Sequence, residues 1–192
     1  MSSNDSACKM KFKTIVITLP DFHCGEAERI TDLLRQGKAD IVHIRKPHAR
    51  IEEVESLLRA IPSDCHCRLV LHDHHVLAQR YSLYGVHLNS RHPEPPVAWT
   101  GSVSRSCHTI EEVKEWKPRC AYVSLSPIFD SISKQGYRSA FTAEDIQCAR
   151  MAGVIDYQVM ALGGVTFDRL PVVEAMGFGG AMILGDAWRG EK

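Results

Sequence analysis

The segment DIVHIRKPHARIEEVESLLRAIPSDCHCRLVLH (40–72) contains one complete strand–helix–strand pattern. Two short β-branched runs, DIVHIR (40–45) and RLVLH (68–72), flank a stretch with apolar side chains at helical spacing. These apolar positions are Ile51, Val54, Leu57, Leu58 and Ile61. Strands that alternate with helices pair in parallel through right-handed crossovers, so the segment predicts an α/β fold.

The same alternation continues in both directions along the chain. Six further strands are predicted at TIVITL (14–19), GVHL (85–88), GSVS (101–104), AYVSL (121–125), YQVMAL (157–162) and GAMIL (180–184). Helices are predicted over 25–36, 76–81, 142–151 and 168–176, and after a capping-box pattern at Thr109 and Glu112. Eight strands fit a closed (β/α)8 TIM barrel or an open doubly wound sheet. The barrel is favoured because eight strands close without exposed edges.

The barrel is expected to be a single domain over residues 1–192 and slightly truncated. Residues 1–13 are polar and form an N-terminal extension. The fourth crossover carries PEPP (93–96), whose prolines exclude a helix there. The C-terminal helix is cut short because the sequence stops soon after the eighth strand.

Composition excludes several classes of protein. Lys plus Arg and Asp plus Glu each number 23, so the formal net charge is zero, which argues against a nucleic-acid partner. No apolar run approaches the ~20 residues that span a bilayer, and no apolar signal core is present near the N-terminus. We therefore expect a cytoplasmic protein with seven reduced cysteines, no membrane contact and a small-molecule substrate. The sequence leaves open whether the protein forms a homodimer.

Polar side chains gather where the predicted strands end. In a barrel of this kind the active site lies at the C-terminal ends of the strands. The candidate site residues there are His43, Arg45, His72, Asp73, Ser106, His108, Ser131, Ser133, Lys134, Gly163, Gly164, Leu184 and Gly185. His43 and Arg45 have the same parity on one strand, so both point into the barrel or both pack outside it.

Each candidate has a structural alternative. His108 precedes a predicted helix, where a histidine either bonds to backbone or exchanges protons with a ligand. The pair Gly163–Gly164 is equally compatible with a plain turn and with a phosphate cradle.

Metal binding and the Cys65–Cys67 segment also have more than one interpretation. His43, His72, His92 and His108 could together bind zinc, and Asp73 could reach magnesium. The segment Cys65-His66-Cys67 is expected to be structural, because its spacing is not that of a zinc finger.

Seven blocks of the chain resemble the thiamine phosphate synthase and TenI family. They are VHIRKP (42–47), LVLHDHHVLA (69–78), YGVHLNS (84–90), SRSCHTIEEV (104–113), AYVSLSPIFDSISKQG (121–136), ALGGVTFDRL (161–170) and GFGGAMILGDAW (177–188). The resemblance implies a (β/α)8 barrel that binds a thiazole phosphate. It also implies one of two activities: magnesium-dependent coupling of hydroxymethylpyrimidine diphosphate to thiazole phosphate, or metal-free tautomerisation of thiazole carboxylate phosphate.

Departures from the synthase pattern favour the tautomerase. The Gln-x-Arg-Glu-Lys block of the synthases appears here as HIRKP (43–47), and their Asn-Asp pair appears as His72-Asp73. Their second aspartate aligns with His92, so one magnesium ligand is lost. HIR (43–45) and RSCH (105–108) are similar to the TenI blocks His-Ile-Arg and Arg-Ser-Val-His.

The resemblance assigns a role to each candidate residue. It implies that His108 is the general acid–base, assisted by His43 and Ser106, and that Arg45 and His43 hold the substrate carboxylate. The remaining substrate-binding candidates are His72, Asp73, the phosphate-binding set Gly163, Gly164, Leu184 and Gly185, and the lid set Ser131, Ser133 and Lys134. The tautomerase needs no cofactor. The alternative synthase would use magnesium at Asp73, and a non-catalytic precursor-binding protein or a zinc hydrolase would be functions of other classes.

Overall fold

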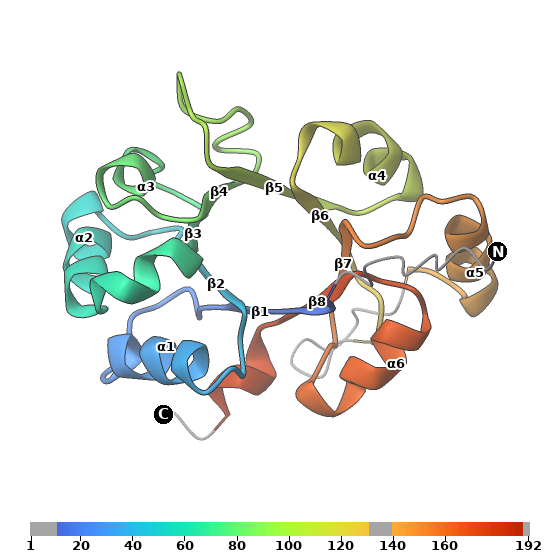
Figure 1. Cartoon of the computed structure of the whole chain (residues 1–192), viewed down its shortest axis with the longest axis horizontal. Helices are drawn as coiled ribbons and strands as arrows, with labels where there is room; N and C mark the ends of the chain where they lie inside the picture. The colour runs from blue at the N-terminus through green and yellow to red at the C-terminus, as the bar shows by residue number, and fades with distance from the viewer. Residues whose placement is uncertain (1–10, 131–139, 190–192) are drawn as a thin grey trace, which may run out of the picture.

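The fold is seen in a computed structural model, which describes residues 11–130 and 140–189. Eight parallel strands close into a barrel in the order β1-β2-β3-β4-β5-β6-β7-β8, with β1 paired to β8 (Figure 1). The strands are β1 Lys13–Ile17, β2 Ile41–Ile44, β3 Leu69–Leu71, β4 Gly85–Leu88, β5 Ser102–Cys107, β6 Tyr122–Leu125, β7 Val159–Leu162 and β8 Gly180–Ile183. The predicted (β/α)8 barrel is confirmed, and the open sheet is excluded.

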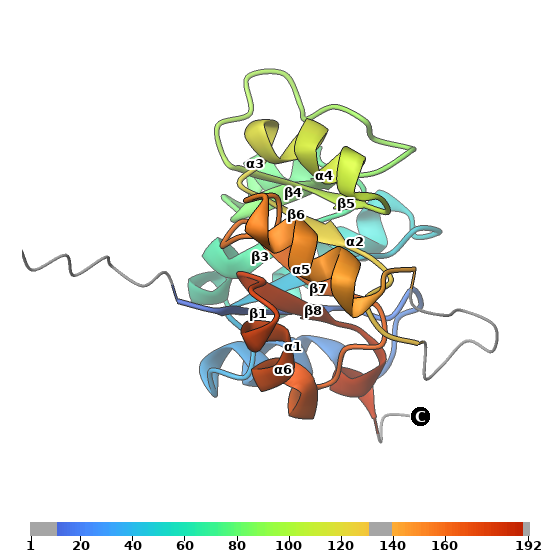
Figure 2. The same cartoon turned by 90° about the vertical axis from the view of Figure 1, so that its right-hand side faces the viewer.

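Six α-helices in the described ranges surround the barrel (Figures 1 and 2). They are α1 Glu26–Arg35, α2 Ile51–Ala60, α3 Val76–Arg80, α4 Ile110–Trp116, α5 Ala143–Met151 and α6 Leu170–Ala175. Short 3-10 turns add Ser63–Arg68, Lys117–Arg119, Phe167–Arg169 and Gly185–Trp188. None of the helices in the described ranges is long and apolar enough to span a membrane.

Two apolar layers follow from the alternation of side chains along each strand. On β2, Val42 and Ile44 belong to the cluster between sheet and helices, whereas Ile41 belongs to a second cluster inside the barrel. On β3, Leu69 and Leu71 face outward in the same way and Val70 faces inward. Residues two positions away from Ile41 or Val70 on the same strand therefore also point into the barrel. These inward positions carry the candidate site.

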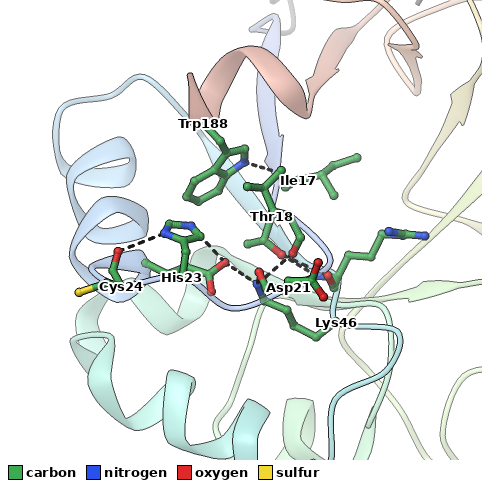
Figure 3. A network of polar contacts seen from close by, with 10 residues as sticks. Ile17, Thr18, Asp21, His23, Cys24, Lys46 and Trp188 are labelled. Carbon is green, nitrogen blue, oxygen red and sulfur yellow. Dashed lines mark hydrogen bonds and ion pairs between the residues drawn. The ribbon is translucent and has the colours of Figure 1, made fainter. Parts of the chain in front are cut away.

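The fourth crossover lacks a helix, as predicted, and a 3-10 turn follows β8 in the described residues. Residues 89–101, between β4 and β5, contain no helix and form the loop that projects beside these strands (Figure 1). After β8, the turn Gly185–Trp188 stands where an eighth helix would follow. Trp188 is buried, and its Nε1 donates to the carbonyl oxygen of Ile17 at 2.7 Å (Figure 3). This turn therefore covers β1 near its C-terminal end.

Helix and strand ends differ from the predictions in small ways. The strand predicted at 101–104 extends to Cys107, and the helix predicted from Asp168 begins at Leu170 after a 3-10 turn. The capping box at Thr109 forms by half: Glu112 N–H donates to Thr109 Oγ1, but the Glu112 carboxylate accepts from the backbone N–H of His108. The six cysteines in the described ranges are free thiols.

Candidate active site at the barrel mouth

The inside of the barrel has a polar side and an apolar side. Inward positions of β1, β7 and β8 carry Ile15, Ile17, Met160, Leu162, Met182 and Leu184. Inward positions of β2 to β6 carry His43, His72, His87, Ser104, Ser106, Tyr122 and Ser124. A ligand that enters from the C-terminal ends of the strands therefore meets hydrogen-bonding groups on one side and an apolar wall on the other.

Three buried histidines lie at the centre of the polar side. His43 is fully buried, and its Nδ1 lies 2.9 Å from His72 Nε2, within hydrogen-bond distance. His43 Nε2 lies 2.6 Å from the Tyr122 hydroxyl. The His72 and His87 rings stack with centroids 4.1 Å apart. The structure thus places His43 inside the barrel, and His72 lies against it.

Sequence reasoning did not include His87 among the site residues. Its Nδ1 lies 2.9 Å from Ser104 Oγ and its Nε2 lies 3.0 Å from Ser106 Oγ. Ser106 Oγ in turn accepts from Ser124 Oγ at 3.3 Å. The signal that could have found His87 is parity: it follows inward-facing Gly85 by two residues on β4, just as His43 follows Ile41 on β2.

All three imidazoles are neutral at pH 7. Burial lowers the pKa of His43 and His72 well below the ordinary value, and it lowers the pKa of His87 to about 3. The positive charge of Arg45 adds to the lowering at His72 and His87. A neutral imidazole has one donor and one acceptor nitrogen, which suits the chain of contacts described above.

The two basic residues after β2 have different places. Arg45 is half-buried and acts electrostatically on His72 and His87, so its charge lies on the polar side of the mouth. Lys46 is buried, and its Nζ donates to Glu26 Oε1 at 2.6 Å and to the carbonyl oxygens of Leu19 and Asp21 (Figure 3). Arg45 is therefore the cation available to a ligand, and Lys46 stabilises the β1–α1 loop.

Asp73, the candidate magnesium ligand, is already ion-paired. Its Oδ1 accepts from Arg91 Nε at 2.9 Å and from Arg91 Nη2 at 2.8 Å, and His92 Nε2 lies 3.7 Å away. Its Oδ2 is buried without a hydrogen-bond partner among the described residues. One free oxygen is present, but a guanidinium and an imidazole occupy the surroundings where a second acidic ligand is needed. The arrangement does not fit a magnesium–pyrophosphate site.

His108 stands at the rim, immediately after β5. Its backbone N–H donates to Glu112, which ties it to the start of α4. Its Nδ1 lies 3.2 Å from Ser126 Oγ and 3.3 Å from the Ser126 carbonyl oxygen, across the gap to β6. The side chain is therefore exposed at the mouth and oriented by a residue of the next strand's loop. Ser106, which lies two residues before His108 on β5, contacts His87 instead. Arg105, which precedes Ser106, faces outward and stacks on Trp116 with Cζ 3.8 Å from the ring centroid.

The glycines after β7 allow a close approach of two loops. Gly163 and Gly164 have φ of 93° and 62°. A Cβ on Gly164 would overlap the carbonyl oxygen of Asp130, so this glycine lets the loop after β6 pack against β7. Gly185 has open space around it, and Leu184 joins the apolar wall. Phosphate binding by these residues stays a prediction. Ser131, Ser133 and Lys134 lie outside the described residues.

Gly164→Ala is expected to lower the free energy of unfolding by about 1–3 kcal/mol, because it combines a strained φ with a backbone overlap. Urea unfolding measures the change. Gly185→Ala is the matched control, since its Cβ meets nothing within 4 Å and its φ lies outside the left-handed region. Equal stability of the two variants would contradict the packing role of Gly164.

The zinc set predicted from the sequence is not the one that converges. His43 and His72 are together, but His92 lies against Asp73 and His75, and His108 lies against Ser126. His87 takes the third place beside His43 and His72. The Cys65-His66-Cys67 segment is structural as expected: it lies in a 3-10 turn, and His66 Nε2 contacts the carbonyl oxygens of Leu58 and Ile61.

Comparisons with known proteins agree on one family. The sequence model of the family described as thiamine monophosphate synthase (TMP-TENI) matches residues 15–185. A curated thiamine-phosphate synthase of Salinibacter ruber is 27% identical over 182 residues, which cover 86% of this chain and 78% of that protein. A solved Bacteroides thetaiotaomicron structure titled thiamine phosphate pyrophosphorylase is 42% identical with a TM-score of 0.86, covering 94% of this chain and 87% of that one. A Pyrococcus furiosus thiamine phosphate pyrophosphorylase, 19% identical with a TM-score of 0.71 and covering 93% and 91%, shares the fold.

Proposed function

The chain belongs to the thiamine monophosphate synthase family, and from that membership we propose that it is a thiamine-biosynthesis enzyme that acts on a thiazole phosphate. We further propose that it acts by proton transfer, as a thiazole tautomerase. The ligand would lie in the mouth of the barrel, with its anionic groups toward Arg45 and the N–H groups after β7 and β8. The half-buried Arg45 and the asymmetric lining of the barrel support a flat, anionic heterocycle as ligand.

The ion pair of Asp73 is the observation that carries the choice of tautomerase. Coupling with release of pyrophosphate needs a metal that neutralises the leaving group. Arg91 donates two hydrogen bonds to the one carboxylate available, and His92 occupies the position of the second. These residues do not fit magnesium, and the reaction that we propose does not use it. Tautomerisation needs only a group that accepts a proton and returns it.

His108 is the group that we assign to this proton transfer. Neutral His108 takes the proton from the ring carbon of thiazole carboxylate phosphate, and the resulting imidazolium returns it to the exocyclic carbon. The net charge and the atoms of the substrate are unchanged, as an isomerisation requires. Ser126 contacts Nδ1, so Nε2 is the nitrogen assigned to exchange with the ligand.

The coupling synthase is the second candidate, and the names of the relatives favour it. For this activity Arg91 would have to release Asp73 when a pyrimidine diphosphate binds. The buried, unpartnered Oδ2 of Asp73 would then be a metal ligand. The choice between the two activities thus depends on whether the ion pair between Arg91 and Asp73 stays closed.

Two parallel assays test the proposal. Purified protein is given thiazole carboxylate phosphate alone, or thiazole phosphate with hydroxymethylpyrimidine diphosphate, each with magnesium and with EDTA. We expect isomerisation at the same rate under both conditions and no coupling. Magnesium-dependent coupling without isomerisation would establish the synthase instead. Tight binding without turnover in either assay would indicate a precursor-binding protein and refute both enzymes.

A further inference from the structure

The ring nitrogens of the three buried histidines converge on one point inside the barrel. One ring nitrogen from each of His43, His72 and His87 lies within 4.8 Å of the others. They come from three consecutive strands, β2, β3 and β4. His43 and His87 are strand residues and His72 directly follows β3, so their backbones are fixed by the barrel. In the described part of the chain this is the group of histidine, cysteine and acidic side chains that converges to metal-binding distances.

The distances are close to those of a tetrahedral site. Zinc binds imidazole nitrogen at about 2.0–2.1 Å, which places two such ligands about 3.4 Å apart in a tetrahedron. His43 Nδ1 and His72 Nε2 are 2.9 Å apart, already near that separation. His87 has to turn one nitrogen from a serine hydroxyl toward the other two. The proposal requires this movement to come from rotation about the side-chain bonds of His87, because its backbone is part of β4.

The surroundings provide outer contacts for two of the three histidines, His43 and His87. A ligating imidazole normally uses its second nitrogen to hold an oxygen partner, which fixes the ring. His43 Nε2 has the Tyr122 hydroxyl at 2.6 Å. Ser104 and Ser106 lie beside the two nitrogens of His87, so one of these hydroxyls is the candidate partner for its non-ligating nitrogen.

We propose that His43, His72 and His87 bind one divalent transition-metal ion, of the zinc type, at the floor of the barrel mouth. Three neutral ligands leave the fourth position open toward the mouth, as in catalytic rather than structural zinc sites. The nearby Arg45 adds positive charge, so the fourth ligand is expected to be hydroxide. This proposal does not rest on the tautomerase reaction, because it concerns the metal affinity of three side chains.

Cobalt and zinc binding to the whole protein test the site directly. The protein is stripped with a chelator, dialysed and titrated with Co²⁺, whose visible absorption is intense in a tetrahedral site and weak in an octahedral one. We expect an intense spectrum that saturates at one ion per chain and disappears when Zn²⁺ is added. Zinc is also expected to raise the melting temperature of the stripped wild-type protein. A weak, octahedral spectrum would overturn the proposal without any variant.

Substitutions then locate the ion. His72→Gln and His87→Gln are each expected to weaken zinc binding by more than the 10–100-fold that follows loss of an outer-shell partner, and Tyr122→Phe by about 10–100-fold. His48→Gln removes an exposed histidine, and Cys67→Ser disrupts the other His/Cys-rich segment; both should keep wild-type affinity. Far-UV circular dichroism and cooperative unfolding verify that each variant is folded. Zinc affinity that falls with Cys67→Ser and not with the histidine variants would place the ion elsewhere.

Discussion

Lys46→Met is expected to lower the free energy of unfolding by about 3–5 kcal/mol, because it leaves a buried carboxylate without its counter-charge. Lys46 and Glu26 have side chains that are 1% and 2% exposed, and their charged atoms are 2.6 Å apart. Burial lowers the pKa of Lys46, and the hydrogen bond to Glu26 opposes that lowering. The charge of the ammonium is therefore stabilised by Glu26 and not by hydration.

The geometry around Lys46 makes the loss larger than that of one ion pair. Nζ also donates to the carbonyl oxygens of Leu19 and Asp21, which lie in the loop after β1 (Figure 3). Phe22 covers the ammonium, with its ring centroid 4.6 Å from Nζ. A methionine has a similar stem but no donors. One buried carboxylate oxygen and two half-buried carbonyl oxygens would thus lose their partner at once.

Guanidinium chloride unfolding measures this effect in Lys46→Met, in Lys11→Met and in the double variant Lys46→Met/Glu26→Leu. Lys11→Met is the matched control: its ion pair with Asp40 is exposed, so its loss should change stability by less than about 1 kcal/mol. Adding Glu26→Leu to Lys46→Met should recover part of the loss, because the unpaired charge is removed. If Lys46→Met costs no more than Lys11→Met, the pair does not stabilise the fold.

The sequence predicts the barrel well because the fold depends on local patterns. Period-2 runs such as DIVHIR (40–45) and the helical spacing after Ile51 are short-range signals, and eight of them imply closure. The inward direction of His43 follows from parity once its strand is known. Parity applies equally to His87, so this residue could have been found by extending the same argument to β4.

Contacts between distant loops could not be predicted from the sequence. Lys46 meets Glu26 across 20 residues, and Asp73 meets Arg91 through a helix-free loop whose path no periodicity describes. The resemblance to family blocks locates His92 in place of an aspartate, but only coordinates place Arg91 on the remaining carboxylate. Side-chain direction outside regular elements is set by tertiary packing, and motif spacing contains no information about it.

His108→Ala is expected to lower the turnover of thiazole carboxylate phosphate by about 10²–10⁴-fold, the usual contribution of a positioned acid–base group. Binding of the substrate should change little, because we propose that Arg45 and backbone N–H groups, rather than His108, hold its anionic groups. The fold should also persist: the bond from residue 108 to Glu112 uses the backbone N–H, which alanine keeps. The rate constant is followed by the ultraviolet change on aromatisation, and binding by calorimetry.

Ser126→Ala separates positioning from proton transfer. This variant removes the hydroxyl 3.2 Å from His108 Nδ1 but leaves the Ser126 carbonyl oxygen, which lies 3.3 Å from the same nitrogen. A smaller loss of turnover is expected, and the pH profile of the rate should keep the limb due to the imidazole, which His108→Ala should abolish. If His108 had only a structural role, both substitutions would change substrate binding or stability. The pH profile of the rate would then keep its shape in His108→Ala. Wild-type turnover in His108→Ala would assign the proton transfer to another group, and the inward imidazoles of His43 and His87 would be next to be substituted.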